Sequence, residues 1–326
     1  MKLGSLANGN RDGCLVLVDD NLRKAIKVVN VVETMQEAIE NWSQLEAELM
    51  DISLRLNRGL AADAMPFDSA KMKSPFPRAF QWLDGSAYVN HVELLRKARG
   101  VELPKKFWSD PLMYQGGSDH FLDPNEPILL IDQGWGADFE GELAVVVDDV
   151  PLGVTITEAK KHIKLIMLLN DISLRNLIPE ELSKGFGFVH GKPPTAFAPV
   201  AVTPESLGCA WNEGKLEFTL FIYLNGKKVG WVNSGIDMTF SFPELVSHAA
   251  KTRPLRAGTI IGSGTISNAD QKHGYSCLAE IRMIETIRYG EPKTAFLNFG
   301  DEIKIEMCDE EGNSVFGAIE QVVMRP

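Results

Sequence analysis

One stretch in the middle of the chain organises the hydrophobic pattern around it. Residues 143–147 form a fully apolar, largely β-branched run, which is typical of a strand buried on both faces. Glu140 and Glu142 come just before this run, and since residues two apart in a strand point to the same face, their carboxylates are predicted to lie side by side. The two carboxylates would repel each other and lose hydration, and a bound cation would relieve both effects. The alternative is that this end of the strand lies in solvent and both glutamates are simply exposed.

The beginning of the chain is predicted to fold as a small module of strands followed by one helix. Residues 2–33 consist of short apolar runs separated by turn residues, a pattern that indicates strands. Thr34 opens a capping box, and apolar residues then recur at helical spacing up to a stop at Gly59. We therefore place a β/helix module at residues 1–74 and a larger domain at residues 75–326.

The larger domain is predicted to contain many strands and a few helices. We expect helices at residues 89–98 and 155–169, the latter capped by a threonine, and a strand at 278–284. Asn225-Gly226 indicates a hairpin turn. Residues 101–127 are rich in Pro, Gly and aromatic residues, which indicates a long, ordered and functional loop. The predicted fold class is α+β, mostly β.

Composition and charge exclude several classes of partner. The chain has 326 residues and a formal net charge of −11, which argues against a surface for nucleic acid or for an anionic membrane. No apolar run approaches the ~18 residues that span a bilayer, and the first residues lack the apolar segment of a signal peptide. The four cysteines are far apart, which is typical of free thiols in a reducing cytosol. We expect a soluble, cytoplasmic protein.

Three further acids, Asp84, Asp171 and Glu280, are candidates for chemistry. Asp171 follows a predicted helix, and since an anion at that end opposes the helix dipole, a cation nearby would stabilise it. Carboxylate oxygens without cysteine partners form a hard site, which favours Mg²⁺ or Ca²⁺ over zinc. The alternative is a set of solvated surface carboxylates.

His91, Arg175 and Lys192 are the candidate base and cations. His91 lies seven residues after Asp84, which places both on one face if both belong to a helix, although a lone histidine is more often structural. Arg175 and Lys192 are candidate contacts for an anion or oxyanion, or else solvated surface charges.

Six short motifs follow one another in a fixed order through most of residues 75–326. They are Asp84 with His91, Pro111–Tyr114, Phe139–Ala144, Asn170-Asp171 with Arg175, Gly191-Lys192, and Gly262–Ser267. In this combination the chain resembles the fumarylacetoacetase (fumarylacetoacetate hydrolase) family, most nearly its bacterial type, and the N-terminal module fits more loosely.

The resemblance implies a fold, a metal and an assembly. The fold would be a C-terminal mixed β-sandwich roll with a small N-terminal β module, assembled as a homodimer. A divalent cation, Mg²⁺ or Ca²⁺ with Mn²⁺ as another choice, would be held by carboxylates. The ligands that the resemblance implies are Asp84, Glu140, Glu142 and Asp171.

The resemblance also implies roles for the remaining candidates. His91 would activate a water molecule and would be oriented by Glu280, while Lys192 and Arg175 would stabilise the oxyanion. The implied substrate contacts are Tyr114, Arg99, Lys192 and Thr265. Two positions depart from the family pattern, with Ser86 in place of a Tyr and Ile178 about where a Gln of the oxyanion hole is expected. These departures indicate an altered substrate pocket around an intact metal site.

The implied activity is metal-dependent hydrolysis of a C–C bond in a 1,3-diketo acid. Fumarylacetoacetate would give fumarate and acetoacetate, the last step of tyrosine degradation. Sister activities on the same scaffold are acylpyruvate hydrolase, oxaloacetate decarboxylase, and hydratase or isomerase of 2-oxo dienoates. A non-catalytic, metal-stabilised binding protein is the alternative of a different class.

Overall fold

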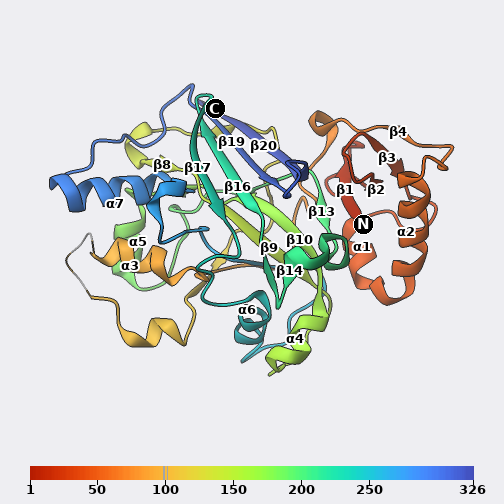
Figure 1. Cartoon of the computed structure of the whole chain (residues 1–326), viewed down its shortest axis with the longest axis horizontal. Helices are drawn as coiled ribbons and strands as arrows, with labels where there is room; N and C mark the ends of the chain where they lie inside the picture. Colours follow the sequence, from red (N-terminus) through yellow and green to blue (C-terminus); the bar gives the residue numbers. More distant parts are fainter. Residues whose placement is uncertain (98–99, 101) are drawn as a thin grey trace.

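A large mixed sheet runs through the protein, and a computed structural model describes it over residues 1–97, 100 and 102–326 (Figure 1). In spatial order, the path through this sheet is β4 (Met65–Pro66), β3 (Lys24–Lys27), β2 (Cys14–Val18), β1 (Lys2–Leu6), β13 (Ala201–Val202), β10 (Ile163–Asn170), β9 (Gly141–Val147), β18 (Thr259–Gly262), β5 (Trp82–Gly85) and β6 (Met113–Gly116), with β12 (Ala196–Phe197) pairing to β10. The strand β18 therefore lies between two strands that precede it by more than a hundred positions in the chain.

A second sheet packs against one face of the large one. Its order is β17 (Lys227–Asn233), β16 (Thr219–Leu224), β19 (Glu302–Cys308), β20 (Ser314–Met324) and β7 (Ile128–Leu129). Two small pairs complete the described strands: β8 (Ala137–Asp138) with β11 (Ser173–Leu174), and β14 (Trp211–Asn212) with β15 (Lys215–Leu216). Val145 and Ile166 of the large sheet share one core with Ile305 of the second sheet. The two sheets thus form the sandwich that the family resemblance implies.

Helices cover the rest of the large sheet. They are α1 (Met35–Glu40), α2 (Trp42–Asn57), α3 (Val89–Lys97), α4 (Ile156–His162), α5 (Ile178–Lys184), α6 (Phe242–Ala249) and α7 (Leu278–Tyr289). Short 3-10 turns lie at η1 (Ser69–Lys71), η2 (Lys105–Trp108), η3 (Gln133–Trp135), η4 (Pro204–Ala210) and η5 (Gln271–His273). Figure 1 shows α1 and α2 beside the N-terminal strands, while α3 and α7 lie together at the opposite end. No helix in the described ranges is long and apolar enough to cross a bilayer.

The central strand is confirmed, and its alternation explains its composition. Every residue of β9 is buried, with Val145 in the core between the sheets and Val146 in the core under α1 and α2. A strand buried on both faces needs apolar residues throughout. The hairpin turn at Asn225-Gly226 is also confirmed, with positive φ at both residues.

Two predicted elements are of the wrong type. Residues 155–169 do not form one helix: Thr155 caps only α4, and the chain then continues as the strand β10. The run from Ile163 to Leu169 is buried on both sides of the sheet, and such a run has no period that distinguishes strand from helix. Residues 278–284 are not a strand but the first half of α7, so Glu280 lies in a helical turn.

Two further predictions need adjustment. The helix after Thr34 breaks at Asn41, and α2 then ends just before Gly59, whose positive φ matches the predicted stop. The predicted loop at residues 101–127 is not loop throughout, because it contains the strand β6, which pairs with β5. The predicted end of the helix at 89–98 lies outside the described residues.

Candidate active site

Strands from distant parts of the chain bring three carboxylates to one edge of the large sheet. Strand β9 is antiparallel to both of its neighbours, β10 and β18, and β18 is parallel to β5. The start of β9 therefore meets the ends of β10 and β5. Glu142 is the second residue of β9, Asp171 directly follows β10, and Asp84 is near the end of β5. Asp84 is thus on a strand, and it does not share a helix with His91 as the spacing allowed.

The carboxylates of Asp84, Glu142 and Asp171 form a buried cluster that can hold a metal ion. Ligand oxygens from the three side chains all lie within 4.8 Å of one another. One oxygen of Glu142, Oε2, is buried without a hydrogen-bond partner in the described structure. Burial raises the pKa of Asp84 and of Glu142 well above the ordinary range. The charge of Asp171 adds to this effect at Asp84, and the charge of Asp84 adds to it at Glu142. Hard oxygens and an unsatisfied buried acceptor fit a hard divalent cation.

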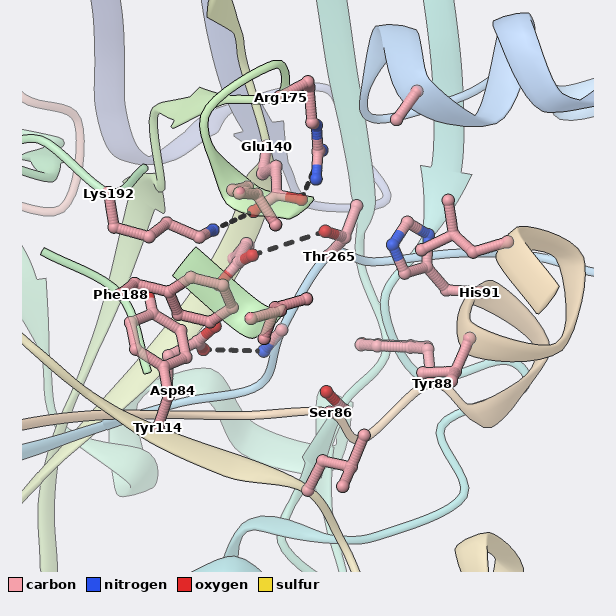
Figure 2. A pocket seen from close by; sticks show the side chains of 18 of the residues that line it. Asp84, Ser86, Tyr88, His91, Tyr114, Glu140, Arg175, Phe188, Lys192 and Thr265 are labelled. Atoms are coloured by element: carbon pink, nitrogen blue, oxygen red, sulfur yellow. Dashed lines mark hydrogen bonds and ion pairs between the residues drawn. The ribbon is translucent and has the colours of Figure 1, made fainter. Parts of the chain in front are cut away.

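Glu140 is buried beside this cluster but pairs with two cations. Its carboxylate accepts from the Arg175 guanidinium at 2.5 Å and from the Lys192 ammonium at 2.6 Å (Figure 2). Burial opposes its charge, yet Arg175 and Lys192 hold its pKa well below the ordinary range. Asp171 is also bound by Lys192, at 2.5 Å. Glu140, the fourth acid that the resemblance implies as a ligand, thus lies beside the cluster with both oxygens bound to cations, and exposure of the two glutamates is excluded.

Tyr114, Thr265 and Gly264 fix the orientation of the carboxylates. The Tyr114 hydroxyl donates to Asp171 at 2.7 Å, and the Thr265 hydroxyl lies 3.5 Å from Glu142. The Gly264 N–H donates to Asp84 at 3.0 Å. Gly264 has a φ of +72°, and a Cβ there would lie 2.3 Å from the carbonyl oxygen of Gly85, so only glycine fits. The sequence named Tyr114 and Thr265 only through the family resemblance.

His91 and Glu280 form a buried pair, and His91 lines a cavity together with Asp84 and Glu142. His91 lies in the first turn of α3 and Glu280 in the first turn of α7, and Nδ1 of His91 is 2.8 Å from the Glu280 carboxylate. Because an ionised carboxylate only accepts, the neutral imidazole in this pair carries its proton on Nδ1 and its lone pair on Nε2. Ser267 donates to the same Glu280 oxygen at 2.6 Å. Figure 2 shows the His91 ring directed toward Thr265.

Asp138 is a functional support that sequence reasoning missed. Its buried carboxylate accepts from Nε of Arg175 at 2.9 Å and from the N–H groups of Leu278 and Ala279, at 2.7 and 3.0 Å. It therefore caps α7 from the strand β8 and holds both Arg175 and Glu280 in position. No local motif around residue 278 encodes this cap, which explains why the helix was read as a strand.

Replacing Asp138 with Ala is expected to lower the free energy of unfolding by about 3–5 kcal/mol, the usual cost of removing one partner of a buried ion pair. Denaturant titration measures this loss. Asp132 is a matched control, since its exposed carboxylate caps η3 through the Gly134 N–H at 2.8 Å. Asp132→Ala is expected to cost about 1 kcal/mol. Equal effects of the two substitutions would contradict the proposed support role.

Asp84 and Glu142 of the cluster and His91 of the pair line one cavity of about 630 Å³. Besides the charged residues, its wall carries many apolar side chains, which include Val92, Leu95, Phe107, Leu112, Leu182, Phe188, Met283 and Phe296. Ser86 and Ile178, the two departures from the family pattern, both line it. Arg282 is a further lining residue that the sequence reasoning did not single out. Arg99 lies outside the described residues.

Comparison with protein-family models matches nearly the whole chain. Residues 81–324 match the model described as Fumarylacetoacetate (FAA) hydrolase C-terminal. Residues 1–78 match the model described as Fumarylacetoacetase N-terminal domain 2.

Similar proteins carry several different activities. Oxaloacetate tautomerase YisK of Bacillus subtilis (strain 168) is 26% identical over 267 residues, which cover 77% of this chain and 84% of the relative. A 2,4-didehydro-3-deoxy-L-rhamnonate hydrolase of Sphingomonas sp. (strain SKA58) is 25% identical over 230 residues, or 70% of this chain and 76% of the relative. The fold is shared with maleylpyruvate hydrolase from Sphingobium sp. SYK-6, solved with manganese (II) ion and pyruvate, at a TM-score of 0.66, 15% identity and coverage of 100% and 99%.

Proposed function

This chain belongs to the fumarylacetoacetate hydrolase family, and on that premise we propose that it is a metal-dependent hydrolase of a C–C bond in a 1,3-diketo acid. The observation that carries the proposal is the single cavity that joins a three-carboxylate cluster to a carboxylate-oriented histidine. Water activation needs such a histidine, whereas decarboxylation needs no attacking water. Fumarylacetoacetate, giving fumarate and acetoacetate, is the substrate that we propose first.

The metal would be held by Asp84, Glu142 and Asp171, with Glu140 at the edge of the site. A bound Mg²⁺, Mn²⁺ or Ca²⁺ supplies Lewis-acid polarisation of the diketone oxygens. The unpartnered Oε2 of Glu142 and the all-oxygen ligand set fit such an ion. Manganese in the structurally similar maleylpyruvate hydrolase supports this proposal.

In the proposed reaction, the protein's own groups move protons and hold charge. Nε2 of His91 takes a proton from water, and the ionised Glu280 stabilises the resulting imidazolium. The hydroxide adds to a ketone carbon, and Lys192 donates a hydrogen bond to the resulting tetrahedral oxyanion. An ammonium has three N–H donors, of which Glu140 and Asp171 use two, so the third is free to contact the oxyanion. Collapse then breaks the C–C bond, and the leaving enolate accepts a proton from His91.

The direct test follows loss of the ultraviolet absorbance of fumarylacetoacetate with Mg²⁺, with and without EDTA. Loss that EDTA abolishes supports the reaction and the metal together. If acylpyruvates or oxaloacetate are consumed instead, the metal site stands and the assignment moves to a sister activity. Absence of turnover with all three, combined with normal metal binding, would favour the non-catalytic alternative.

Tautomerisation of oxaloacetate is the second candidate function. Oxaloacetate tautomerases from Bacillus subtilis and from Homo sapiens, the latter 24% identical over 184 residues, are among the relatives. A keto–enol exchange needs a base but no attacking water, so His91 could serve both reactions. Incubating the enol and keto forms of oxaloacetate separately with the protein distinguishes this candidate, because a tautomerase interconverts them without forming pyruvate.

Arg282 supports a substrate with a second carboxylate. Its guanidinium lies over the Phe296 ring, 4.0 Å from the centroid, and donates to the carbonyl oxygen of Thr294. No carboxylate in the described part of the chain forms a salt bridge with it, although the side chain is only partly exposed and lines the cavity. Fumarylacetoacetate carries a carboxylate at each end, so one end can reach the metal and the other Arg282.

Replacing Arg282 with Gln is therefore expected to raise KM for fumarylacetoacetate about 10- to 100-fold while kcat changes little, since a charge-assisted contact contributes about 1.5–3 kcal/mol. Steady-state kinetics measure both constants. Arg288, on the exposed end of the same helix, provides a matched control substitution. A fall in kcat with unchanged KM would contradict the assignment of Arg282 to substrate binding.

A further inference from the structure

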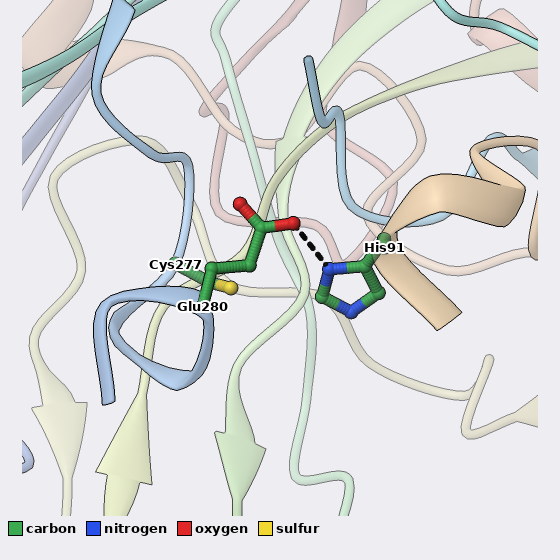
Figure 3. Close-up of side chains that lie close together, drawn as sticks. All are labelled: His91, Cys277 and Glu280. Atoms are coloured by element: carbon green, nitrogen blue, oxygen red, sulfur yellow. Dashed lines mark hydrogen bonds and ion pairs between the residues drawn. The ribbon is translucent and has the colours of Figure 1, made fainter. Parts of the chain in front are cut away.

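We propose that His91, Cys277 and Glu280 form a second metal site, selective for a borderline-soft divalent cation such as Zn²⁺, whose occupation inhibits the enzyme. A ring nitrogen of His91, Sγ of Cys277 and a carboxylate oxygen of Glu280 all lie within 4.8 Å of one another, and Nδ1 is the ring nitrogen that faces Glu280, at 2.8 Å (Figure 3). One nitrogen, one sulfur and one carboxylate oxygen match the ligand types of three-residue zinc sites. The inhibitory effect rests on the role of His91 in the proposed function, whereas the binding itself does not.

The geometry suits zinc after a small adjustment. Zinc binds sulfur at about 2.3 Å and imidazole nitrogen at about 2.0 Å, so tetrahedral ligand atoms stand about 3.5 Å apart. Nδ1 of His91 and the Glu280 oxygen, 2.8 Å apart, therefore need to separate by about 0.7 Å, while no pair of ligand atoms needs to close by more than about 1.3 Å. All three residues are held in place: Cys277 is the N-cap of α7, Glu280 follows in its first turn, and His91 lies on α3, which packs against α7.

The charges balance on binding. The Cys277 thiol is buried, and a thiol loses its proton when it binds a metal ion. Binding of Zn²⁺ releases that one proton, and the thiolate with the Glu280 carboxylate then neutralises the two positive charges. Neutral His91 supplies the third ligand, and water completes the coordination. No electron transfer is involved.

Occupation of this site would remove the catalytic base. In the metal-free pair, Nδ1–H donates to Glu280 and the lone pair of Nε2 is available to water. A cation on Nδ1 displaces that proton, and the neutral ring then carries its proton on Nε2. A protonated Nε2 cannot accept a proton from water, so turnover stops while the carboxylate cluster keeps its own ion. His91 is 9% exposed and lines the cavity, which provides an entry path.

The test titrates Co²⁺, as a spectroscopic substitute for zinc, into the Mg²⁺-saturated protein. Mg²⁺ occupies hard oxygen sites and does not compete for a thiolate. We expect about one equivalent of Co²⁺ to produce a thiolate-to-cobalt absorption band, and Zn²⁺ to remove it. Cys277→Ser is expected to lack the band, and Cys277→Ala serves the same purpose if the serine variant does not fold. Cys209→Ser, at an exposed thiol, is the matched control and keeps the band.

Turnover is measured in parallel on the same Mg²⁺-saturated samples. Zn²⁺ is expected to inhibit the wild type and Cys209→Ser, while Cys277→Ser needs about 10- to 100-fold more Zn²⁺ for equal inhibition. Absence of the band in the wild type, or its persistence in both Cys277 variants, overturns the second site. A normal band with undiminished turnover in excess Zn²⁺ leaves the site standing and overturns the role of His91 as base.

Discussion

His91→Ala is expected to lower kcat about 10²- to 10⁴-fold and to leave the affinity of the carboxylate cluster for its divalent cation unchanged. The imidazole is the only group in the proposed reaction that both removes a proton from water and returns it to the leaving enolate. It makes no contact with Asp84, Glu142 or Asp171 among the described hydrogen bonds, so the carboxylate cluster keeps its geometry. Two measurements test this prediction: the turnover of fumarylacetoacetate, and the binding of Mn²⁺ measured by calorimetry.

Glu280→Gln separates the role of the histidine from that of its partner. Glutamine keeps the shape and the hydrogen bond from Nδ1 but removes the negative charge that stabilises the imidazolium. We expect a smaller loss of kcat than in His91→Ala.

A His91→Ala variant that retains wild-type turnover would end the assignment of His91 as the base, whatever the metal affinity of that variant.

Glu142→Gln is expected to abolish metal binding and to stabilise the metal-free protein at the same time. Loss of the metal removes several kcal/mol of transition-state stabilisation, or about 10³-fold in rate. Burial and the neighbouring Asp84 raise the pKa of Glu142, so the native state holds its proton more tightly than the unfolded chain does. As pH rises through that raised pKa, the metal-free wild type therefore loses stability. The variant carries a neutral glutamine at this position, so its stability does not fall in this way as pH rises.

The stability gain should consequently depend on pH. We expect the metal-free Glu142→Gln variant to match the wild type at low pH, where Glu142 is protonated in both the folded and unfolded states. At higher pH the variant should be more stable by about 1–3 kcal/mol. Thermal unfolding in EDTA across the pH range measures this difference. A variant that is less stable than the wild type at every pH would contradict the proposed repulsion among these carboxylates.

The sequence could predict those parts of the site that strand periodicity and the order of short motifs reveal. Glu140 and Glu142 stand out by their place before a fully apolar strand; that pattern left their exposure open, and both are buried. The family resemblance supplied His91 and Glu280, which are 189 residues apart, because no local pattern joins them. The catalytic and ligand roles of these residues remain predictions.

The errors came from elements whose identity is decided by tertiary contacts. The run at residues 163–169 fits a helix or a buried strand equally well, and only its neighbours β9 and β13 decide. The start of α7 is capped by Asp138, which precedes it by 140 residues, so inspection of residues 277–281 alone could not reveal it. Arg175 and Lys192 were identified as cations, but the sequence did not show that both bind Glu140.

The position of β18 in the large sheet has a consequence for biosynthesis. Residues 259–262 insert between β5 and β9, both made much earlier at the ribosome. Until β18 emerges, the apolar edge of β9 has no partner on that side, and the hydrogen bond from Gly264 to Asp84 cannot form. Before residues 259–264 are synthesised, this edge of β9 is therefore unpaired and the candidate site is incomplete. Completion of the candidate site is thereby coupled to synthesis of the last third of the chain.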